Sequence, residues 1–468
     1  MPARTPAPRA ARPLAAVAVA VVATAAALAL VAQPARAEAP RSFTLDNGAE
    51  VRLFPSAGLG WVGVVAAYEV GFLHEPEGRA QMSHLVEHLR ITAPAAGAAA
   101  NEVWAQLGAL GSANGETQTG FTYYDTLVPA DRLELALRVE AERLTALAPT
   151  QADLEREGPR AAREATNMLG SPDPFLHKFA LMAAVQGWAH GAAVAALVGG
   201  LDRVPIDEAE RFRVEHYTPG ALTLLVTGDF DPAAARELIG RTIGAVEPAP
   251  APLAPAIDWG AQPAERRLAW DLPRSAVIVA HEPPADRLDR AAVSAAMALL
   301  PAVLHADPLE SVGPVLGTGL LWPAGETPTM ALGVVREGFT AEDAAEEIAS
   351  RLDALAEGGL PPHLLAPLRA GRTLPAALAP PELEMQGRQL AAMRGIDVGR
   401  ATAMAALQTS LNLHALERAV GGDPEGLRQH LRELDAGSWR ALLGRALAPE
   451  RRFVTILEPA PRPAPAAD

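Results

Sequence analysis

The sequence His-Leu-Val-Glu-His at residues 84–88 combines residue types and spacing that can hold a metal ion. In a helix over residues 81–91, His84 and His88 stand at positions i and i+4, on the same face. Two imidazoles so placed can both bind one ion of the zinc class. Glu87 then lies where its carboxylate can take a proton from a water that the metal has acidified. This order inverts the commoner zinc-peptidase motif, in which the glutamate follows the first histidine.

These five residues do not establish a site by themselves. A string of this form arises by chance in roughly one chain of this length in a hundred. A zinc site of this kind also needs a third protein ligand, and the string does not supply one. The decision therefore rests on the acidic segment at residues 154–165, Leu-Glu-Arg-Glu-Gly-Pro-Arg-Ala-Ala-Arg-Glu-Ala. A solvated, charged helix is the alternative interpretation of that segment.

With this segment, the sequence resembles the pitrilysin/insulinase family of zinc peptidases. In that family a glutamate about 76 residues after the second histidine is the third zinc ligand, and another acidic residue precedes it by seven positions. The resemblance implies that Glu164 completes a site for one Zn²⁺ per chain with His84 and His88. It also implies that Glu157 assists catalysis beside Glu87, by orienting the ligands or tuning the charge of the site.

The helix that carries these glutamates has two possible starting points. Two helical turns separate Glu157 from Glu164, so both would face the same way on one helix. Gly158 and Pro159 lie between them and disfavour an uninterrupted helix. A helix beginning at Pro159 would leave Glu157 on the preceding turn.

The elements before the motif are predicted from turn residues and apolar runs. Asn47-Gly48 between alternating apolar residues predicts a hairpin over residues 43–53. The nearly continuous apolar run at residues 62–70 predicts a buried strand. We therefore expect the histidine helix to follow a strand directly and to pack on its sheet.

After the motif, the family's usual F-x-G-T segment is replaced by a loop of small residues at 91–97. The chain then matches the family at Asn114 and Thr117, although Gly115 replaces the family's alanine. One interpretation is that Asn114 and Thr117 bind substrate at a strand edge, where an extended peptide can add as a further strand. The other is an ordinary sheet strand with polar turn residues.

We predict an α+β fold with two structurally repeated α/β-sandwich domains, each a sheet covered by helices, that close as a clamshell. The repeat and the closure are implied by the resemblance alone. The expected division is a signal peptide at 1–37, a zinc-bearing domain at 38–247, a linker rich in proline and alanine at 248–265, and an inactive repeat domain at 266–468.

The second half lacks two residues that the resemblance leads us to expect. Active family members use an arginine and a tyrosine, seven residues apart, to hold the substrate backbone over the zinc. Residues 309–322, where the pair should fall, contain neither type, and every tyrosine lies in the first half. Some bacterial relatives divide these groups between two chains. We therefore expect a homologous partner subunit, without zinc, that supplies the arginine and tyrosine.

The N-terminal residues predict export. Three arginines precede an uncharged apolar run at residues 14–31, and Ala35-Arg36-Ala37 has the form of a signal-peptide cleavage site. The expected location is the periplasm or the outside of a bacterium, with no membrane span after cleavage. An uncleaved membrane anchor is the alternative, because 18 apolar residues can just cross a bilayer.

Composition excludes two further possibilities. The chain has no cysteine, so disulfides cannot stabilise it. Four of its 40 basic residues lie in the signal, which leaves 36 basic and 55 acidic side chains and a net charge of −19. This balance argues against binding to nucleic acid.

His177 and His190 are additional histidines, but packing explains them without a metal.

From these observations we predict a zinc endopeptidase that cleaves unfolded or short peptides. We expect the chain to be the zinc-bearing subunit of a two-chain complex. The alternative is a non-catalytic subunit of the same fold, in which zinc serves assembly or peptide capture. The presence of Glu87 weighs against the alternative, because a structural zinc site does not need a carboxylate there.

Overall fold

The structure, a computed structural model, describes residues 41–460 except for a few short stretches. The predicted signal peptide therefore lies outside the described residues. The stretches left out are 146–148, 170–174, 192–200, 254, 271–273, 306, 318–327, 377 and 379.

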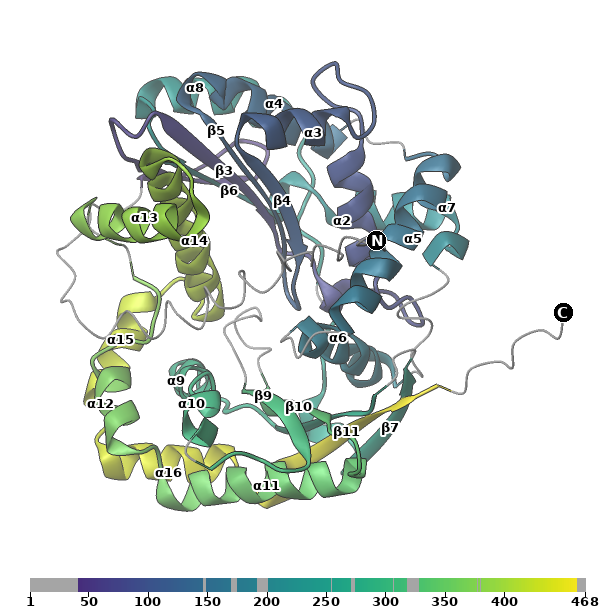
Figure 1. The fold of residues 1–468 in the computed structure, drawn as a ribbon, viewed down its shortest axis with the longest axis vertical. Coiled ribbons are helices and arrows are strands. Elements are labelled where there is room, and N and C mark those ends of the chain that lie inside the picture. Colours follow the sequence, from purple (N-terminus) through teal and green to yellow (C-terminus); the bar gives the residue numbers. More distant parts are fainter. Residues whose placement is uncertain are drawn as a thin grey trace, which may run out of the picture.

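Two β-sheets, one above the other in Figure 1, form the framework of the described chain. The first has the order β1-β2-β6-β3-β5-β4 and the second has the order β7-β11-β8-β10-β9. The strands of the first sheet are β1 (Arg41–Thr44), β2 (Glu50–Pro55), β3 (Trp61–Tyr68), β4 (Ser112–Thr117), β5 (Thr122–Pro129) and β6 (Leu222–Gly228). Those of the second are β7 (Glu265–Trp270), β8 (Ala276–His281), β9 (Val312–Gly317), β10 (Thr329–Val335) and β11 (Arg452–Pro459).

The two sheets repeat one topology. In the first, β2 and β6 are parallel, and β6, β3, β5 and β4 follow in antiparallel pairs. In the second, β7 and β11 are parallel, and β11, β8, β10 and β9 follow in the same way. The structure therefore confirms the predicted α+β fold built from two repeated units, with β1 as an addition to the first.

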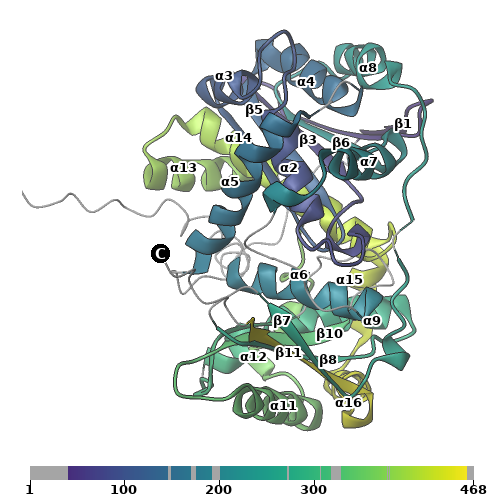
Figure 2. The ribbon, with the colours of Figure 1, turned by 90° about the vertical axis from the view of Figure 1, so that its right-hand side faces the viewer.

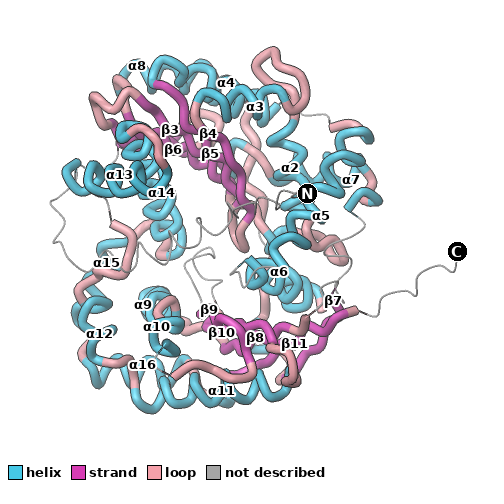
Figure 3. The backbone as a smooth tube through the Cα atoms, viewed as in Figure 1, coloured by secondary structure: helices cyan, strands magenta, loops and turns pink. Residues whose placement is uncertain are grey.

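Helices cover both sheets, as the tube in Figure 3 shows. In the first half they are α2 (Met82–Thr92), α3 (Glu102–Leu110), α4 (Leu133–Thr145), α5 (Gln151–Leu169), α6 (Phe175–His190), α7 (Ile206–His216) and α8 (Pro232–Arg241). In the second half they are α9 (Arg287–Met297), α10 (Leu300–His305), α11 (Ala341–Gly358), α12 (Pro362–Arg369), α13 (Pro380–Arg394), α14 (Val398–Ala419), α15 (Pro424–Glu433) and α16 (Ala436–Ala446). Single turns of 3₁₀ helix connect several of these elements.

Each half contributes one helix to the sheet of the other half (Figures 1 and 2). Helix α6 packs on β7, β10 and β11, where Phe179 and Trp188 join the apolar core of the second sheet. Helix α14 packs on β3 and β6, where Leu407 and Leu411 contact Val65 and its neighbours. The sequence patterns did not predict this exchange. The division into domains 38–247 and 266–468 stays our proposal, in which each domain contributes a helix to the other sheet.

The local predictions for the first sheet are confirmed. Strands β1 and β2 form the expected hairpin, with Thr44 opposite Glu50 and with Gly48 at a φ of 94°. A left-handed φ is favourable at glycine because glycine has no β-carbon. Every residue of β3 after Trp61 is buried, which fits the apolar run that predicted it.

The predicted linker runs along the surface of the first half before it enters the second. The amide of Gly220 donates to the Ala249 carbonyl (2.9 Å), and the Thr218 hydroxyl donates to the Pro250 carbonyl (2.7 Å). Trp259, a few residues later, is buried in the core of the second sheet. Within the described part of the chain, no helix combines the length and the apolar character that crossing a membrane requires.

Candidate metal centre

Helix α2 positions both histidines. Leu85, Val86 and Leu89 are buried in the core of the first sheet, and His84 and His88 lie on the side that faces α5. The predicted helix over residues 81–91 is therefore confirmed to within one residue at each end. Figure 2 shows α2 and α5 side by side.

Helix α5 carries both acidic residues on one continuous helix. Pro159 lies inside α5, and the helix passes through it without a break. Proline leaves one carbonyl of the preceding turn without its helical donor, so tertiary packing must compensate. Helix α5 packs against both α2 and α6. The alternative of a helix beginning at Pro159 is wrong, and Glu157 and Glu164 lie on the same helix.

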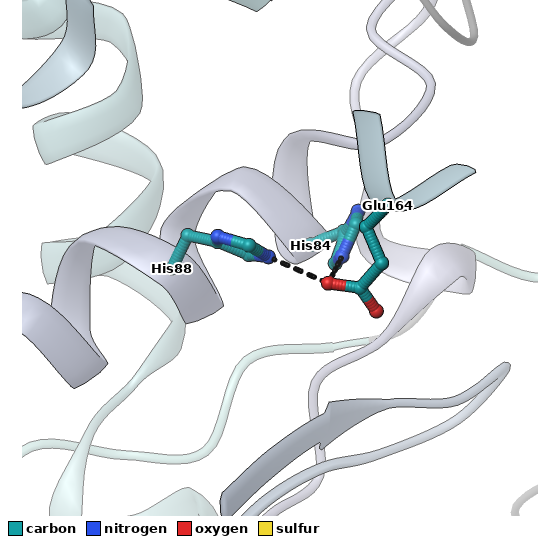
Figure 4. A group of neighbouring side chains, drawn as sticks. All are labelled: His84, His88 and Glu164. Carbon is teal, nitrogen blue, oxygen red and sulfur yellow. Dashed lines mark ion pairs between the residues drawn. The ribbon is translucent and has the colours of Figure 1, made fainter. Parts of the chain in front are cut away.

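The structure brings His84, His88 and Glu164 together, as Figure 4 shows. The Glu164 Oε2 atom is 3.3 Å from His88 Nε2 and 3.9 Å from His84 Nε2. The two imidazole rings stand nearly perpendicular, with their centroids 4.8 Å apart. Within the described ranges, these side chains form the one group of three or more that could hold a metal ion.

The donor set and the spacing of these atoms fit zinc. The ligand atoms of a tetrahedral zinc site lie about 3.3 Å from one another, because zinc–nitrogen and zinc–oxygen bonds are about 2 Å long. Both Nε2 atoms face Glu164, while the Nδ1 atoms have other partners. His84 Nδ1 is 3.0 Å from Gln81 Oε1, and His88 Nδ1 is 3.6 Å from Glu157 Oε2. Partners of this kind orient the imidazoles that bind metals.

The site is buried on the histidine side and open on the glutamate side. The exposed fractions of the side chains are 2% for His84, 15% for His88 and 41% for Glu164. A catalytic zinc site leaves one coordination position accessible, whereas a structural site is closed by four protein ligands. The arrangement therefore resembles a catalytic site more than a structural one.

The charges of the site are coupled. Burial lowers the pKa of His84 and keeps its imidazole neutral. Burial acts in the same direction on His88, but the carboxylates of Glu157 and Glu164 outweigh it and raise the pKa of His88 to about 9. For Glu164, burial is outweighed by the two histidines, which hold its pKa far below the ordinary value. Without a metal, protonated His88 thus pairs with ionised glutamates.

Zinc binding should consequently depend on pH over an unusual range. Zinc must displace the proton of His88, so its apparent affinity rises about tenfold per pH unit until the pH passes the pKa of about 9. We expect the dissociation constant to fall about 50-fold between pH 7 and pH 9, where half of the His88 side chains are still protonated, measured by competition with a chelator whose own protonation is known. An affinity that is constant above pH 7 would contradict this, because a histidine with an ordinary pKa is already neutral there.

Glu87 is held by the neighbouring strand β4. The Thr117 hydroxyl donates to Glu87 Oε2 at 2.7 Å, and Thr117 is fully buried. A β-carbon at Gly115 would lie 3.2 Å from Glu87 Cγ and 2.5 Å from Ile91 Cδ1. The glycine that replaces the family's alanine therefore leaves space for the side chains of α2. Glu87 is fixed against the sheet, with one oxygen bonded to Thr117.

Replacing Thr117 with valine tests this contact. Valine has nearly the same shape but cannot donate, so Glu87 loses a charge-assisted hydrogen bond of about 1.5–3 kcal/mol. We expect the rate of peptide hydrolysis to fall about tenfold or more while zinc affinity stays unchanged. Thr119→Val is the matched control, because the Thr119 hydroxyl is buried and has no hydrogen-bond partner among the described residues. Equal losses in both variants would show that the Thr117 hydroxyl has no special role.

Other partners of α2 were missed by the sequence analysis. Glu75 is buried and accepts hydrogen bonds from the backbone amides of Gln81 (3.1 Å) and Ser83 (3.0 Å), and from the Ser83 hydroxyl. These bonds satisfy amides at the start of α2 that have no helical partner. Burial outweighs them and raises the pKa of Glu75 to about 8. The role of Glu75 at the start of α2 was not predicted from the sequence.

Arg90 fixes the other end of α2. Its guanidinium is fully buried and lies over the rings of Tyr68, Tyr124 and Tyr217, at 4.5, 4.9 and 4.6 Å from their centroids. Three of the four tyrosines of the chain thus enclose one cation, an attraction that strengthens where water is excluded. No local pattern predicts such a cluster, because its members come from α2, β3, β5 and the segment after α7.

The remaining predicted residues take different positions. Asn114 is exposed on β4, whereas the Thr117 side chain is turned inward to Glu87. His190 Nε2 lies 3.1 Å from the Glu75 carbonyl, away from the metal group. The His177 side chain is not described.

Comparison with known proteins identifies the fold. A protease from Helicobacter pylori superposes with a TM-score of 0.65 and 17% identity, over 92% of this chain and 100% of that one. An inactive M16 peptidase domain from Pseudomonas fluorescens superposes with a TM-score of 0.61 and 14% identity, over 92% of this chain and 100% of that one. The first half of the periplasmic protease PqqL from Escherichia coli superposes with a TM-score of 0.56 and 16% identity, over 91% of this chain and 93% of that one. No protein-family profile and no curated protein sequence matches the chain. The chain thus has the fold of the M16 peptidases, the pitrilysin/insulinase fold.

Proposed function

We propose that this protein is a zinc-dependent endopeptidase that cleaves unfolded or short peptides in the periplasm. The observation that carries the proposal is the meeting of His84, His88 and Glu164 from two helices, with Glu87 on the same helix as both histidines. The M16 peptidase fold supports the proposal, because proteins described as proteases share it.

In the proposed mechanism, His84, His88 and Glu164 would hold a zinc ion. A bound ion would supply Lewis-acid chemistry, lowering the pKa of a water molecule and polarising the carbonyl of the scissile peptide bond. Glu87 takes the proton of the attacking water and transfers it to the leaving amine. The Thr117 hydroxyl fixes one oxygen of Glu87 and leaves the other for this proton. Glu157, in contact with His88 Nδ1, keeps the imidazole oriented.

An extended peptide is the proposed substrate because β4 lies at an edge of the first sheet. Strand β4 pairs only with β5 in the described sheet, so one row of its backbone amides and carbonyls is unpaired there. A peptide can add to such an edge as a further strand. Asn114 is exposed and can contact it, while Thr117 would contribute its backbone, since its side chain is bonded to Glu87.

We further propose that a homologous partner subunit completes the site. Residues 309–322 of the second half contain no arginine and no tyrosine, and β9 occupies the first part of this stretch. The groups that would hold the substrate backbone over the zinc must then come from another chain. The apolar N-terminal segment and the presence of a periplasmic protease among proteins of this fold support export to the periplasm.

A non-catalytic zinc-binding subunit is the second candidate function. The absence of the arginine and tyrosine favours it, and one protein of the same fold is described as an inactive domain. Here the bound zinc would stabilise the fold or help to capture peptides. The partly exposed Glu164 and the well-positioned Glu87 favour the catalytic proposal.

Hydrolysis of a quenched library of unstructured peptides by the purified protein tests the proposal. Chelator-sensitive cleavage by this chain alone would support a peptidase and contradict the need for a partner. If the chain binds one zinc but cleaves nothing, co-purification from the native cell extract should yield a homologous chain with the arginine and tyrosine. If that chain restores no cleavage, the non-catalytic function is correct.

A further inference from the structure

Gln81, which immediately precedes α2, has a backbone conformation that is unfavourable for glutamine. Its φ of 72° and ψ of 11° lie in the left-handed region, and its side chain is fully buried. A β-carbon makes this region costly, so residues other than glycine, asparagine and aspartate rarely occupy it. Strain of this kind persists where surrounding contacts hold it, and it is concentrated at functional sites.

Three contacts hold Gln81, and one of them reaches a histidine of the metal group. Its backbone amide donates to Glu75 Oε2 at 3.1 Å, and its carbonyl accepts from the Leu85 amide at 2.8 Å. Its side-chain oxygen is 3.0 Å from His84 Nδ1. The left-handed backbone of Gln81 thus directs its side chain toward the ring of His84, three residues later in the sequence.

This contact selects one tautomer of His84. An amide oxygen only accepts hydrogen bonds, so the proton of the neutral imidazole must lie on Nδ1. The Nε2 atom then carries the lone pair and faces Glu164 Oε2 at 3.9 Å, which is beyond hydrogen-bond distance but leaves room for an ion that both atoms could bind. The ring of Phe179, with its centroid 6.1 Å away, packs against His84 from helix α6. The imidazole is therefore held by the amide on one side and by an aromatic ring on another.

The two histidines are oriented by different chemistry. His88 Nδ1 is near the Glu157 carboxylate, which also contacts Arg156 and Arg160. His84 lies deeper, and the buried carboxyl group of Glu75 already contacts the backbone amide of Gln81. A neutral amide at position 81 gives the required acceptor without adding a charged group to this buried place.

We infer that Gln81 is a positioning residue that fixes His84 as the Nδ1–H tautomer and aims its Nε2 atom at the metal. The strained backbone of Gln81 is what allows its side chain to reach the ring. This inference rests on the proposed zinc site, although the tautomer itself can be measured without metal.

The first test compares Gln81→Met with Gln81→Glu. Methionine fills nearly the same volume but has no strong acceptor, whereas glutamate keeps one. We expect zinc to bind about 10–100-fold more weakly to Gln81→Met, with the unfolding temperature of the metal-free protein unchanged, because such partners affect metal affinity by this factor. We expect Gln81→Glu to restore an affinity within a few-fold of the wild type. An unchanged affinity in Gln81→Met would overturn the inference.

A matched control separates backbone strain from the contact with His84. Asn101 also precedes a helix, α3, with a φ of 67° and no side-chain capping bond. Asparagine tolerates this backbone better than glutamine does, and Asn101→Gly alters the start of a neighbouring helix without touching His84, so it should leave zinc affinity unchanged. If Asn101→Gly weakens zinc binding as much as Gln81→Met does, the effect is a general loss of helix positioning and the inference fails.

The second test measures the tautomer directly by ¹⁵N NMR of histidine-labelled, metal-free protein, with His84 assigned through a His84→Ala variant. We expect the Nδ1–H form in the wild type and a mixture of tautomers in Gln81→Met. The Nε2–H form in the wild type would overturn the inference. If the wild type shows the Nδ1–H form but binds no zinc, the zinc-peptidase proposal fails while the role of Gln81 in fixing His84 stands.

Discussion

Replacing Glu87 with glutamine is expected to reduce the rate of peptide hydrolysis by about 1,000-fold, in whichever form of the protein cleaves, with or without a partner subunit. Glutamine has the same shape and can still accept the hydrogen bond of Thr117, so the fold should be unchanged. It cannot take a proton from water, and the proposed mechanism has no second residue for this step. The measurement is the initial rate on a quenched peptide at saturating zinc.

Zinc content is the control for this variant. Glu87 is not among the three side chains whose ligand atoms converge, so Glu87→Gln should still bind one zinc per chain. A variant that keeps more than a tenth of the wild-type activity would show that another group acts as the base. A variant that loses both zinc and activity would place Glu87 in the metal site itself.

The second large effect is expected for Glu164→Ala. This change leaves two imidazoles as the protein ligands, so it should weaken zinc binding by more than about 100-fold. That effect is larger than the one expected when a residue that only orients a ligand is removed. Activity should disappear at ordinary zinc concentrations. Alanine is preferred to glutamine because an amide oxygen can still coordinate a metal. The dissociation constant is measured by competition with a chelator.

Glu155→Ala is the matched control for Glu164→Ala. Glu155 is an exposed glutamate on the same helix, outside the metal group. Its replacement changes the net charge by the same amount but should leave zinc affinity within about twofold. If Glu164→Ala retains wild-type affinity, the third ligand is a different residue and the proposed role of α5 is wrong.

The parts of the fold with local signals could be predicted from the sequence. The Asn47-Gly48 turn predicted the first hairpin because only a few residue types accept its backbone angles. The nearly continuous apolar run at residues 62–70 predicted a buried strand, and β3 (Trp61–Tyr68) is buried after its first residue. The spacing of His84 and His88 predicted a shared helix face, and the structure confirms it.

The distant parts of the site had no local signal. Residue spacing alone does not indicate that Glu164 lies beside His88, and only the family resemblance suggested it. The Arg90 cluster and the contact of Thr117 with Glu87 join segments that are far apart in the sequence. Gln81 was missed for a different reason, because its left-handed backbone contradicts the ordinary preference of glutamine.

Local sequence patterns also could not predict that α6 and α14 each pack on the sheet of the other half. Residues Phe179 to Val185 of α6 are all buried, and a helix that is apolar on every side is typical of an interior position. That composition could have indicated burial, but not on which sheet. The choice of sheet depends on the folded arrangement of both halves, which the linear sequence does not display.

The central claim is that one zinc ion binds between α2 and α5. Anomalous diffraction at the zinc absorption edge, from crystals of the zinc-loaded protein, tests it most directly. We predict one strong peak per chain, in contact with Nε2 of His84, Nε2 of His88 and the carboxylate of Glu164. Crystals without such a peak, or with a peak on other residues while these three side chains hold no metal, would contradict the account.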